Sequence, residues 1–225
     1  MKINKLFVVI LVIFLFFTGF ALLKRGKWEK YYKNKLDQPP RQIIVDALQL
    51  FQTSGQAIDL GCGVGNEAFF LLNHGWHVWA VDSESKAIQL IQNRMDTNAI
   101  GKVTAVVANF AEDSTWETLP TVDFIYAAYA LPFCKKEQFG KAWAQIKNHL
   151  VVNGRFAGHF FGLNYRGFSS KEMEEMTFLK REDVLELLQG FEIEYFQERE
   201  EDGLSGTGKS IHSHVFEVIA RKKER

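Results

Sequence analysis

A glycine-rich turn has a spacing of residues that is suited to binding chemistry. The strand-like stretch QAIDL runs directly into GCGVGN, and a helical pattern follows. Glycines at such a turn permit positive φ and let the backbone approach a ligand closely, and the first turn of the helix offers free N–H groups. In a doubly wound α/β sheet, ligands bind beyond the carboxyl ends of the strands. We therefore expect a ligand at this turn, near Asp59, Gly61, Gly63 and Gly65.

The acidic residues around the turn narrow the choice of ligand. A dinucleotide fold would need G-x-G-x-x-G, with its third glycine where this chain has Asn66. Asp59, at the end of the strand, suits an amino group better than a pyrophosphate. Asp82 ends the next strand, HVWAVD, where a carboxylate can accept both hydroxyls of a ribose. The pattern favours a nucleoside ligand with an ammonium group; a redox dinucleotide domain, a ligand-free fold and a helix-capping role for Asp82 remain alternatives.

Strands and helices alternate through most of the chain, which predicts a parallel sheet covered on both faces. The expected strands are 56–60, 77–82, 102–109, 122–129 and 154–162, and the expected helices are 43–51, 66–75, 85–97 and 136–150. A helix at 181–190 and two alternating stretches, 191–200 and 212–222, follow. The expected fold is α/β and Rossmann-like: a doubly wound, mostly parallel seven-stranded sheet with an antiparallel C-terminal hairpin.

The composition argues against a nucleic-acid partner and against a bound metal. The chain has 225 residues with 27 basic and 27 acidic side chains, and no stretch beyond its N-terminal region concentrates positive charge. We therefore expect no nucleic-acid partner. Cys62 and Cys134 lack the paired spacing of a zinc site or a disulfide framework, so no metal is expected either.

The N-terminal segment predicts a membrane anchor. Residues 6–23, LFVVILVIFLFFTGFALL, carry no charge and are long enough to span a bilayer as a helix. A buried core helix and a cleaved signal peptide are the alternatives. More cations follow the segment than precede it, so the remaining chain should face the cytoplasm. We expect a single-pass anchor at 1–24, a linker or lid at 25–42 and one domain at 43–225.

Longer motifs resemble those of a known family. IDLGCGVGNEAFFLLNHGWHVWAVDSESKAI looks like the first two motifs of the class I S-adenosylmethionine-dependent methyltransferases. VVANFAED resembles their third motif, VDFIYAAYALPFC the fourth and LVVNGRFAGHFFG the segment after it. Within the class, the chain is most similar to small bacterial methyltransferases of the tellurite-resistance type, from about Trp28 to Lys222. The resemblance implies S-adenosylmethionine as cofactor and methyl transfer as the reaction.

The resemblance also implies roles for individual residues. It assigns the methionine part of the cofactor to Gly61, Cys62, Gly63 and Gly65, the ribose to Asp82 and Ser83, and the adenine to Asn109 and Phe110. Asn109 stands where an aspartate is common, and its amide oxygen can still face the adenine amino group. Phe110 and Trp79 could instead be core aromatics.

Residues after the fourth strand are implied to meet the methyl group and its acceptor. These are Ala127, Ala128, Tyr129 and Leu131, and Tyr126 or Tyr129 could close that pocket. Upstream, Trp28, Tyr31, Tyr32 and Arg41 could fold over the cofactor as a lid, with packing and membrane-interface roles as alternatives for the aromatics.

Methyl transfer needs alignment and exclusion of water more than it needs acid–base groups. A general base helps only where the acceptor loses a proton; the candidates are His159, His212 and His214, which could equally be packed or surface histidines. Tyr129 is a further catalytic candidate. The fourth motif lacks the D/N-P-P-Y/F pattern of nucleobase N-methylation, which favours a small-molecule acceptor such as a thiol, a chalcogen oxyanion or an amphiphile. A non-catalytic binding protein and an oxidoreductase remain alternatives.

One further motif is interpreted as coincidental. GLSGTGKS, at 203–210, satisfies the phosphate-loop pattern G-x-x-x-x-G-K-[ST]. It follows an acidic stretch and precedes a strand-like alternation, whereas a phosphate loop follows a buried strand and opens a helix. We predict a flexible hairpin loop here.

Overall fold

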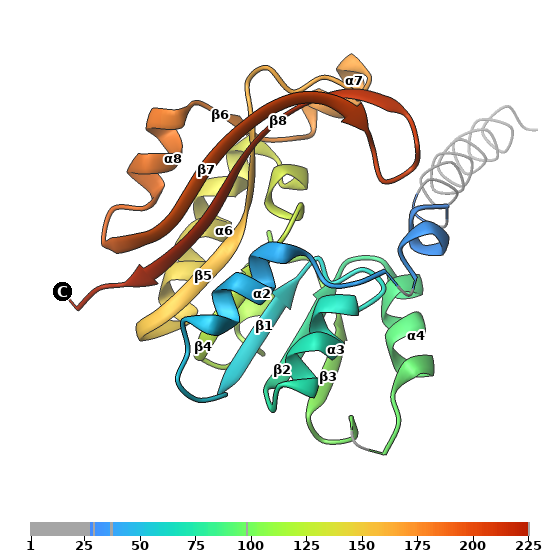
Figure 1. Ribbon diagram of the computed structural model, residues 1–225, viewed down its shortest axis with the longest axis vertical. Helices are drawn as coiled ribbons and strands as arrows, with labels where there is room; N and C mark the ends of the chain where they lie inside the picture. The colour runs from blue at the N-terminus through green and yellow to red at the C-terminus, as the bar shows by residue number, and fades with distance from the viewer. Residues whose placement is uncertain (1–27, 29, 37, 98, 225) are drawn as a thin grey trace, which may run out of the picture.

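One twisted sheet forms the centre of the computed structural model, which describes residues 28, 30–36, 38–97 and 99–224 (Figure 1). Its main path runs β3-β2-β1-β4-β5-β8-β7. The strands are β1 (Gln56–Leu60), β2 (His77–Asp82), β3 (Val103–Val107), β4 (Val122–Ala127), β5 (Leu150–Gly162), β7 (Phe191–Leu204) and β8 (Ser210–Lys222). β1 to β5 are parallel, and β8 runs antiparallel to both β5 and β7.

Helices cover both faces of this sheet, so the doubly wound prediction is confirmed. α2 (Gln42–Gln49), α3 (Asn66–Asn73) and α4 (Ser85–Arg94) share one apolar cluster with the sheet. α5 (Asp113–Trp116), α6 (Lys136–His149) and α8 (Arg181–Leu187) share the other. The short helices η1 (Leu131–Phe133) and α7 (Ser170–Glu174) lie in the connections after β4 and β5.

The order of the strands in the sheet determines where a binding crevice opens. β1 lies in the middle of the sheet and pairs in parallel with β2 on one side and β4 on the other. The chain leaves β1 toward one face and β4 toward the other, because α3 and α6 belong to opposite layers. The loops that follow β1 and β4 therefore diverge, and this divergence opens a crevice at the carboxyl ends of the strands.

The C-terminal hairpin is also confirmed. β7 and β8 pair along their whole length, from Phe191 with Lys222 to Leu204 with Ser210. The tip closes with hydrogen bonds from the N–H of Gly208 to Ser205 O and from the N–H of Ser205 to Lys209 O, each 2.8 Å long. The phosphate-loop-like sequence therefore forms the hairpin tip and opens no helix.

One prediction about the fold, the number of strands, needs correction, and another, the membrane helix, remains untested. The sheet has an eighth strand, β6 (Phe178–Leu179), which pairs with β5; two residues are too few to show a periodic pattern. The predicted membrane helix over 6–23 lies outside the described residues. Within the part of the chain that the structure describes, no helix is both long and apolar enough to cross a membrane.

Candidate functional site

The glycine turn after β1 has the geometry that its sequence predicts. Gly61, Gly63 and Gly65 all have positive φ, at 68°, 53° and 81°. A Cβ atom at Gly61 would lie 2.6 Å from Cβ of Ala130, and one at Gly65 would lie 2.7 Å from Cγ1 of Ile91. A Cβ at Gly63 would meet nothing closer than an atom 3.9 Å away. Gly61 and Gly65 thus allow close packing, whereas Gly63 presents bare backbone to a pocket.

Asp82, at the end of β2, holds this turn. Its Oδ2 accepts a hydrogen bond from the N–H of Gly63 and its Oδ1 accepts one from the N–H of Glu84, both at 2.9 Å. Burial raises the pKa of Asp82, and the two N–H donors favour its charged form. Each carboxylate oxygen keeps a second lone pair for a ligand.

Asp59 is the most deeply buried acid of the site. It is 2% exposed, and its Oδ2 has no hydrogen-bond partner among the described residues. Burial raises its pKa well above the usual value, whereas Arg41 and the N–H of Ala68 favour its charged form. The hydroxyl of Tyr126 also lacks a described partner. Unpaired buried polar atoms are costly, and both residues line the same pocket, so the pocket suits a ligand with polar groups.

Residues before α2 cover this pocket, which we call the inner pocket. Arg41 donates to Oε1 of the buried Glu67 at 2.5 Å and to the hydroxyl of Tyr31 at 3.1 Å. The rings of Trp28 and Tyr32 stack with their centroids 6.3 Å apart. The four residues expected to form a lid, Trp28, Tyr31, Tyr32 and Arg41, all line the inner pocket.

Most of the predicted cofactor residues line the inner pocket together. Those that do are Asp59, Gly61, Cys62, Gly63, Asp82, Ser83 and Phe110, and Tyr126, Ala128 and Tyr129 join them from the end of β4. The pocket also includes Asn66, which the sequence analysis noted only for standing in place of a third glycine, and Glu67 and Glu84, which it did not single out.

Some of the predicted residues lie outside this lining. Gly65 packs against α4, and Ala127 and Leu131 are fully buried in the core under α6. Asn109 is exposed and closes its own turn, where its Oδ1 accepts from the N–H of Ala111 at 3.0 Å. Trp79 packs against the core, in agreement with its alternative reading.

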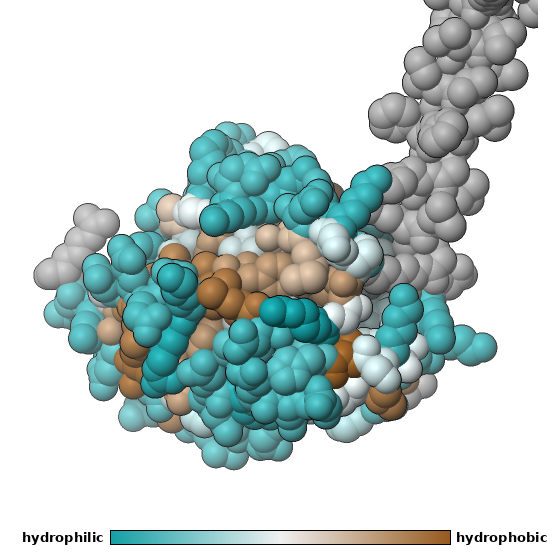
Figure 2. Space-filling model, turned by 90° about the horizontal axis from the view of Figure 1, so that it is seen from above, coloured by the Kyte–Doolittle hydropathy of each residue, from teal (hydrophilic) through white to brown (hydrophobic). Residues whose placement is uncertain are grey.

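A second pocket, which we call the outer pocket, adjoins the first. Six residues line both: Trp28, Tyr31, Lys35, Arg41, Tyr129 and Phe133. The outer pocket extends to β5 and to the inner side of the C-terminal hairpin, which contributes Arg199 and Glu217. From above, apolar side chains lie in the middle of the molecular face, with hydrophilic residues around them (Figure 2).

His159 lines the outer pocket and is paired with an acid. Its neighbour across the antiparallel β5–β8 pair is Glu217, and Nε2 of His159 lies 3.5 Å from Oε2 of Glu217. Arg199 also binds that oxygen. Burial lowers the pKa of His159, and the hydrogen bond to His159 lowers the pKa of Glu217. Tyr129 stacks on the imidazole.

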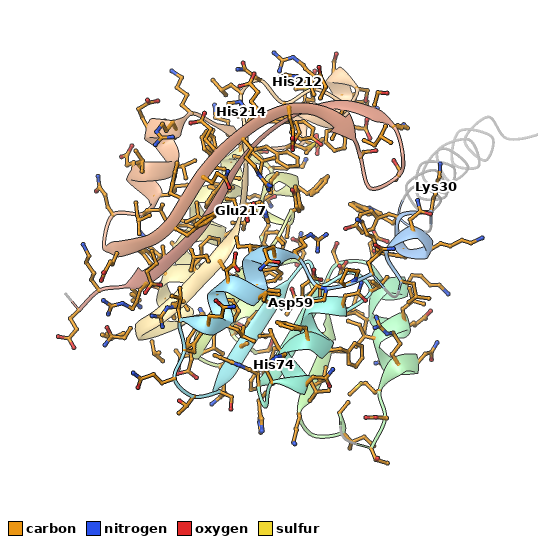
Figure 3. All side chains as sticks on the ribbon, in the orientation of Figure 1. Lys30, Asp59, His74, His212, His214 and Glu217 are labelled. Carbon is orange, nitrogen blue, oxygen red and sulfur yellow. The ribbon has the colours of Figure 1, made fainter. Side chains whose placement is uncertain are left out.

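The other two candidate histidines lie elsewhere. Figure 3 shows His212 and His214 nearer than Glu217 to the hairpin tip, at the start of β8. His212 bonds Asp202 and Glu200, and His214 bonds Glu198 and accepts from the N–H of Asn164. Because side chains alternate between the two faces of a strand, these two histidines point away from the face that carries Glu217. Neither of them lines either pocket. The structure therefore brings only His159 to the site.

The comparisons agree with this geometry. Residues 57–154, which contain the glycine turn, Asp82 and β4, match the methyltransferase domain family. This part of the chain is thus a methyltransferase domain. No curated protein matches the chain in sequence.

Solved structures show the same fold at low identity. TehB from Haemophilus influenzae superposes with a TM-score of 0.68 at 17% identity, over 82% of this chain and 63% of TehB. The N-methyltransferase NodS from Bradyrhizobium japonicum, in complex with S-adenosylhomocysteine, has a TM-score of 0.62 at 16% identity, over 88% and 98% of the two chains. The 1,6-didemethyltoxoflavin-N1-methyltransferase from Burkholderia thailandensis has a TM-score of 0.62 at 19% identity, over 92% and 90%. The chain thus spans less than two thirds of the length of TehB.

Proposed function

We propose that this methyltransferase binds S-adenosylmethionine in the inner pocket and methylates a small molecule held in the outer pocket. The observation that carries the proposal is the junction between the pockets. Tyr129 and Arg41 line both of them, at the crevice beside β1 and β4 where a doubly wound sheet binds its ligands. A donor and an acceptor in these two pockets would meet at Tyr129.

The inner pocket fits the chemistry of S-adenosylmethionine. We assign the methionine ammonium to Asp59, whose unpaired Oδ2 is the buried acceptor that such a group needs. The bare backbone of Gly63 allows close approach beside Cys62, and the free lone pairs of Asp82 suit the ribose hydroxyls, next to Ser83. Phe110 is assigned to one face of the adenine, with Asn109 at its outer edge. In this proposal Gly61 borders the ligand beside Cys62, and Gly65 and Ala127 shape the site without touching the ligand.

The bound cofactor supplies a methyl group that its sulfonium already activates. The chain then has to align the acceptor and exclude water. Trp28, Tyr31 and Tyr32 cover the inner pocket, and the ion pair between Arg41 and Glu67 holds this cover against α3. In this proposal the cover keeps water from the crevice where the two pockets meet.

The way in which the outer pocket is bounded supports a small-molecule acceptor. The hairpin tip reaches the N-terminal cover, because the Nδ2 of Asn34 donates to Gly206 O at 3.3 Å and a Cβ at Gly206 would clash with Tyr31. The outer pocket is therefore bounded on several sides, which does not suit a polymer. The 1,6-didemethyltoxoflavin-N1-methyltransferase, which is similar in fold, was crystallised with bound 1,6-didemethyltoxoflavin.

We further propose that the domain faces the cytoplasm at a membrane. This part of the proposal is supported only by the uncharged stretch 6–23 and the cations that follow it.

Calorimetric titration of the full chain tests cofactor binding. We expect S-adenosylmethionine and S-adenosylhomocysteine to bind and NADH not to bind. Asp59→Asn should weaken both ligands at least tenfold, whereas Asp113→Asn, at an exposed acid on α5, should leave both unchanged. Binding of NADH alone would support the oxidoreductase alternative and contradict the proposal. Binding of S-adenosylmethionine with no methyl transfer to any small molecule would favour a non-catalytic role.

A further inference from the structure

One side of the outer pocket is aromatic, and charged and polar residues form much of the rest of its lining. Phe161 and Tyr165 stack with centroids 4.0 Å apart and an interplanar angle of 11°, and Tyr165 in turn stacks on Phe168 at 5.6 Å. Phe133 meets Phe168 edge to face at 5.8 Å, and Tyr129 completes the wall. Such a surface favours a flat, aromatic ligand, because offset and edge-to-face ring pairs add stabilisation beyond the burial of apolar area.

One buried nitrogen in this wall lacks a partner. His159 is 2% exposed, and its Nδ1 forms no hydrogen bond to any described residue. Glu217 lies on the Nε2 side of the ring. A carboxylate there favours the tautomer with the proton on Nε2, which leaves a lone pair on Nδ1. An acceptor that brings an O–H group to Nδ1 would satisfy this nitrogen.

The charges around His159 suit a proton transfer from a neutral acceptor. Glu217 faces it from β8, Arg199 from β7 and Arg41 from the segment before α2, and Tyr129 packs on its ring after β4. Without a ligand, burial and the two arginines lower the pKa of His159, so the proton transfer depends on the anionic acceptor beside the ring, which together with Glu217 would stabilise protonated His159. An anionic acceptor would be stabilised by the two guanidinium groups, which both line the pocket.

We propose that the methyl acceptor is a planar aromatic molecule with an acidic hydroxyl group, a phenol in the simplest case, and that Nδ1 of His159 takes its proton. The inference rests on the proposed function and names the acceptor class of the same site. The O–H bond of the acceptor breaks, and its proton moves to Nδ1. The phenolate oxygen then forms a bond to the methyl carbon while the carbon–sulfur bond breaks and leaves its electron pair on sulfur. The proton on His159 finally passes to water.

Absorption spectroscopy with 4-nitrophenol tests the proposal without turnover, because the phenol and its phenolate absorb at different wavelengths. The full chain is first saturated with S-adenosylhomocysteine, at a pH where the free probe is mostly protonated. We expect binding of the probe to produce the phenolate band. Phenol should displace the probe, and cyclohexanol should not.

Variants test separately the aromatic acceptor and the role of His159 as the base. His159→Gln should bind the probe without the phenolate band, and Glu217→Gln should require a higher pH to produce it. His212→Gln, at a histidine outside both pockets, should behave as wild type. Phe168→Leu should weaken the probe about tenfold while keeping the band. If His159→Gln no longer binds S-adenosylhomocysteine, Glu217→Gln carries the test.

The outcomes also separate this inference from the proposed function. If the chain binds S-adenosylhomocysteine but not the probe, or if cyclohexanol competes as well as phenol, the aromatic acceptor is wrong. If His159→Gln still produces the phenolate band, the assignment of the base is wrong. Failure to bind S-adenosylhomocysteine at all would overturn the proposed function itself.

Discussion

The imidazole of His159 stacks on the ring of Tyr129, with 4.2 Å between the ring centroids and 18° between the planes. Tyr129 reaches this position with a φ of 53°, in the left-handed region that residues with a Cβ rarely adopt. Such a backbone conformation costs about 1–2 kcal/mol in a non-glycine residue. The strained residue thus forms part of the boundary between the two pockets, as is common at functional sites.

Replacing Tyr129 by glycine and by alanine measures its backbone strain. Both changes remove the aromatic ring, but only Tyr129→Gly also relieves the positive φ. We therefore expect Tyr129→Gly to lower the free energy of unfolding by about 1 kcal/mol less than Tyr129→Ala does. Urea unfolding of both variants measures the difference. A Tyr129→Ala variant as stable as Tyr129→Gly would show that the conformation of Tyr129 stores no strain.

Stability should fall in acid partly because of His159. Burial lowers the pKa of His159 in the folded state, so at pH values just below about 6.5 the unfolded chain binds a proton there and the folded chain does not. The free energy of unfolding then decreases as the pH falls from about 7 toward that lowered pKa. His159→Gln should flatten this decrease in urea unfolding. His212 has the opposite effect on stability. Its hydrogen bonds to Glu200 and Asp202 raise its pKa in the folded state, so its contribution to stability is lost as the pH rises. A slope unchanged in His159→Gln would contradict the pKa assignment.

The ion pair between Arg41 and Glu67 should stabilise the fold as well as the cover. Arg41→Ala would leave Glu67 buried without its partner, which typically costs about 3–5 kcal/mol. The double variant Arg41→Ala/Glu67→Gln should regain much of that loss, because no unpaired charge remains. Thermal or urea unfolding checks both variants. If the double variant is less stable than Arg41→Ala, the loss arises from packing and not from the unpaired charge.

Two glycines of the same turn should respond differently to alanine. Gly65→Ala would clash with Ile91 in addition to its unfavourable φ, so we expect a loss of about 2–4 kcal/mol in stability. Gly63→Ala meets no such clash and should cost only the backbone strain, while its methyl group occupies the inner pocket and weakens S-adenosylmethionine at least tenfold. Unfolding and calorimetry on both variants test the contrast. The opposite ranking in stability would refute it.

Local patterns explain why most of the fold was predictable. β1, β2, α3 and the terminal hairpin carry periodic sequences long enough to be recognised, and the glycine turn lies within ten residues of Asp59. β6 and the short helices were missed because each spans only two to five residues.

Pairs that lie far apart in sequence could not be predicted in the same way. Glu217 meets His159 only through the register of β5 and β8, and a shift of one residue would turn Glu217 to the other face. Glu67 lies on the helix after the glycine turn, and nothing in the local pattern marks it as the partner of Arg41. Side chains alternate between the two faces of β8, so Glu217 lies on the face opposite to His212 and His214. The sequence does not show which of these faces lines the pocket.

Methyl transfer itself is the most direct test of the account. The full chain would be incubated with methyl-labelled S-adenosylmethionine and a cell extract, which is then separated into small molecules, proteins and nucleic acids. We expect S-adenosylhomocysteine to form and the label to appear in the small-molecule fraction, and Asp59→Asn to reduce both. No S-adenosylhomocysteine, or label confined to proteins or nucleic acids, would contradict the account.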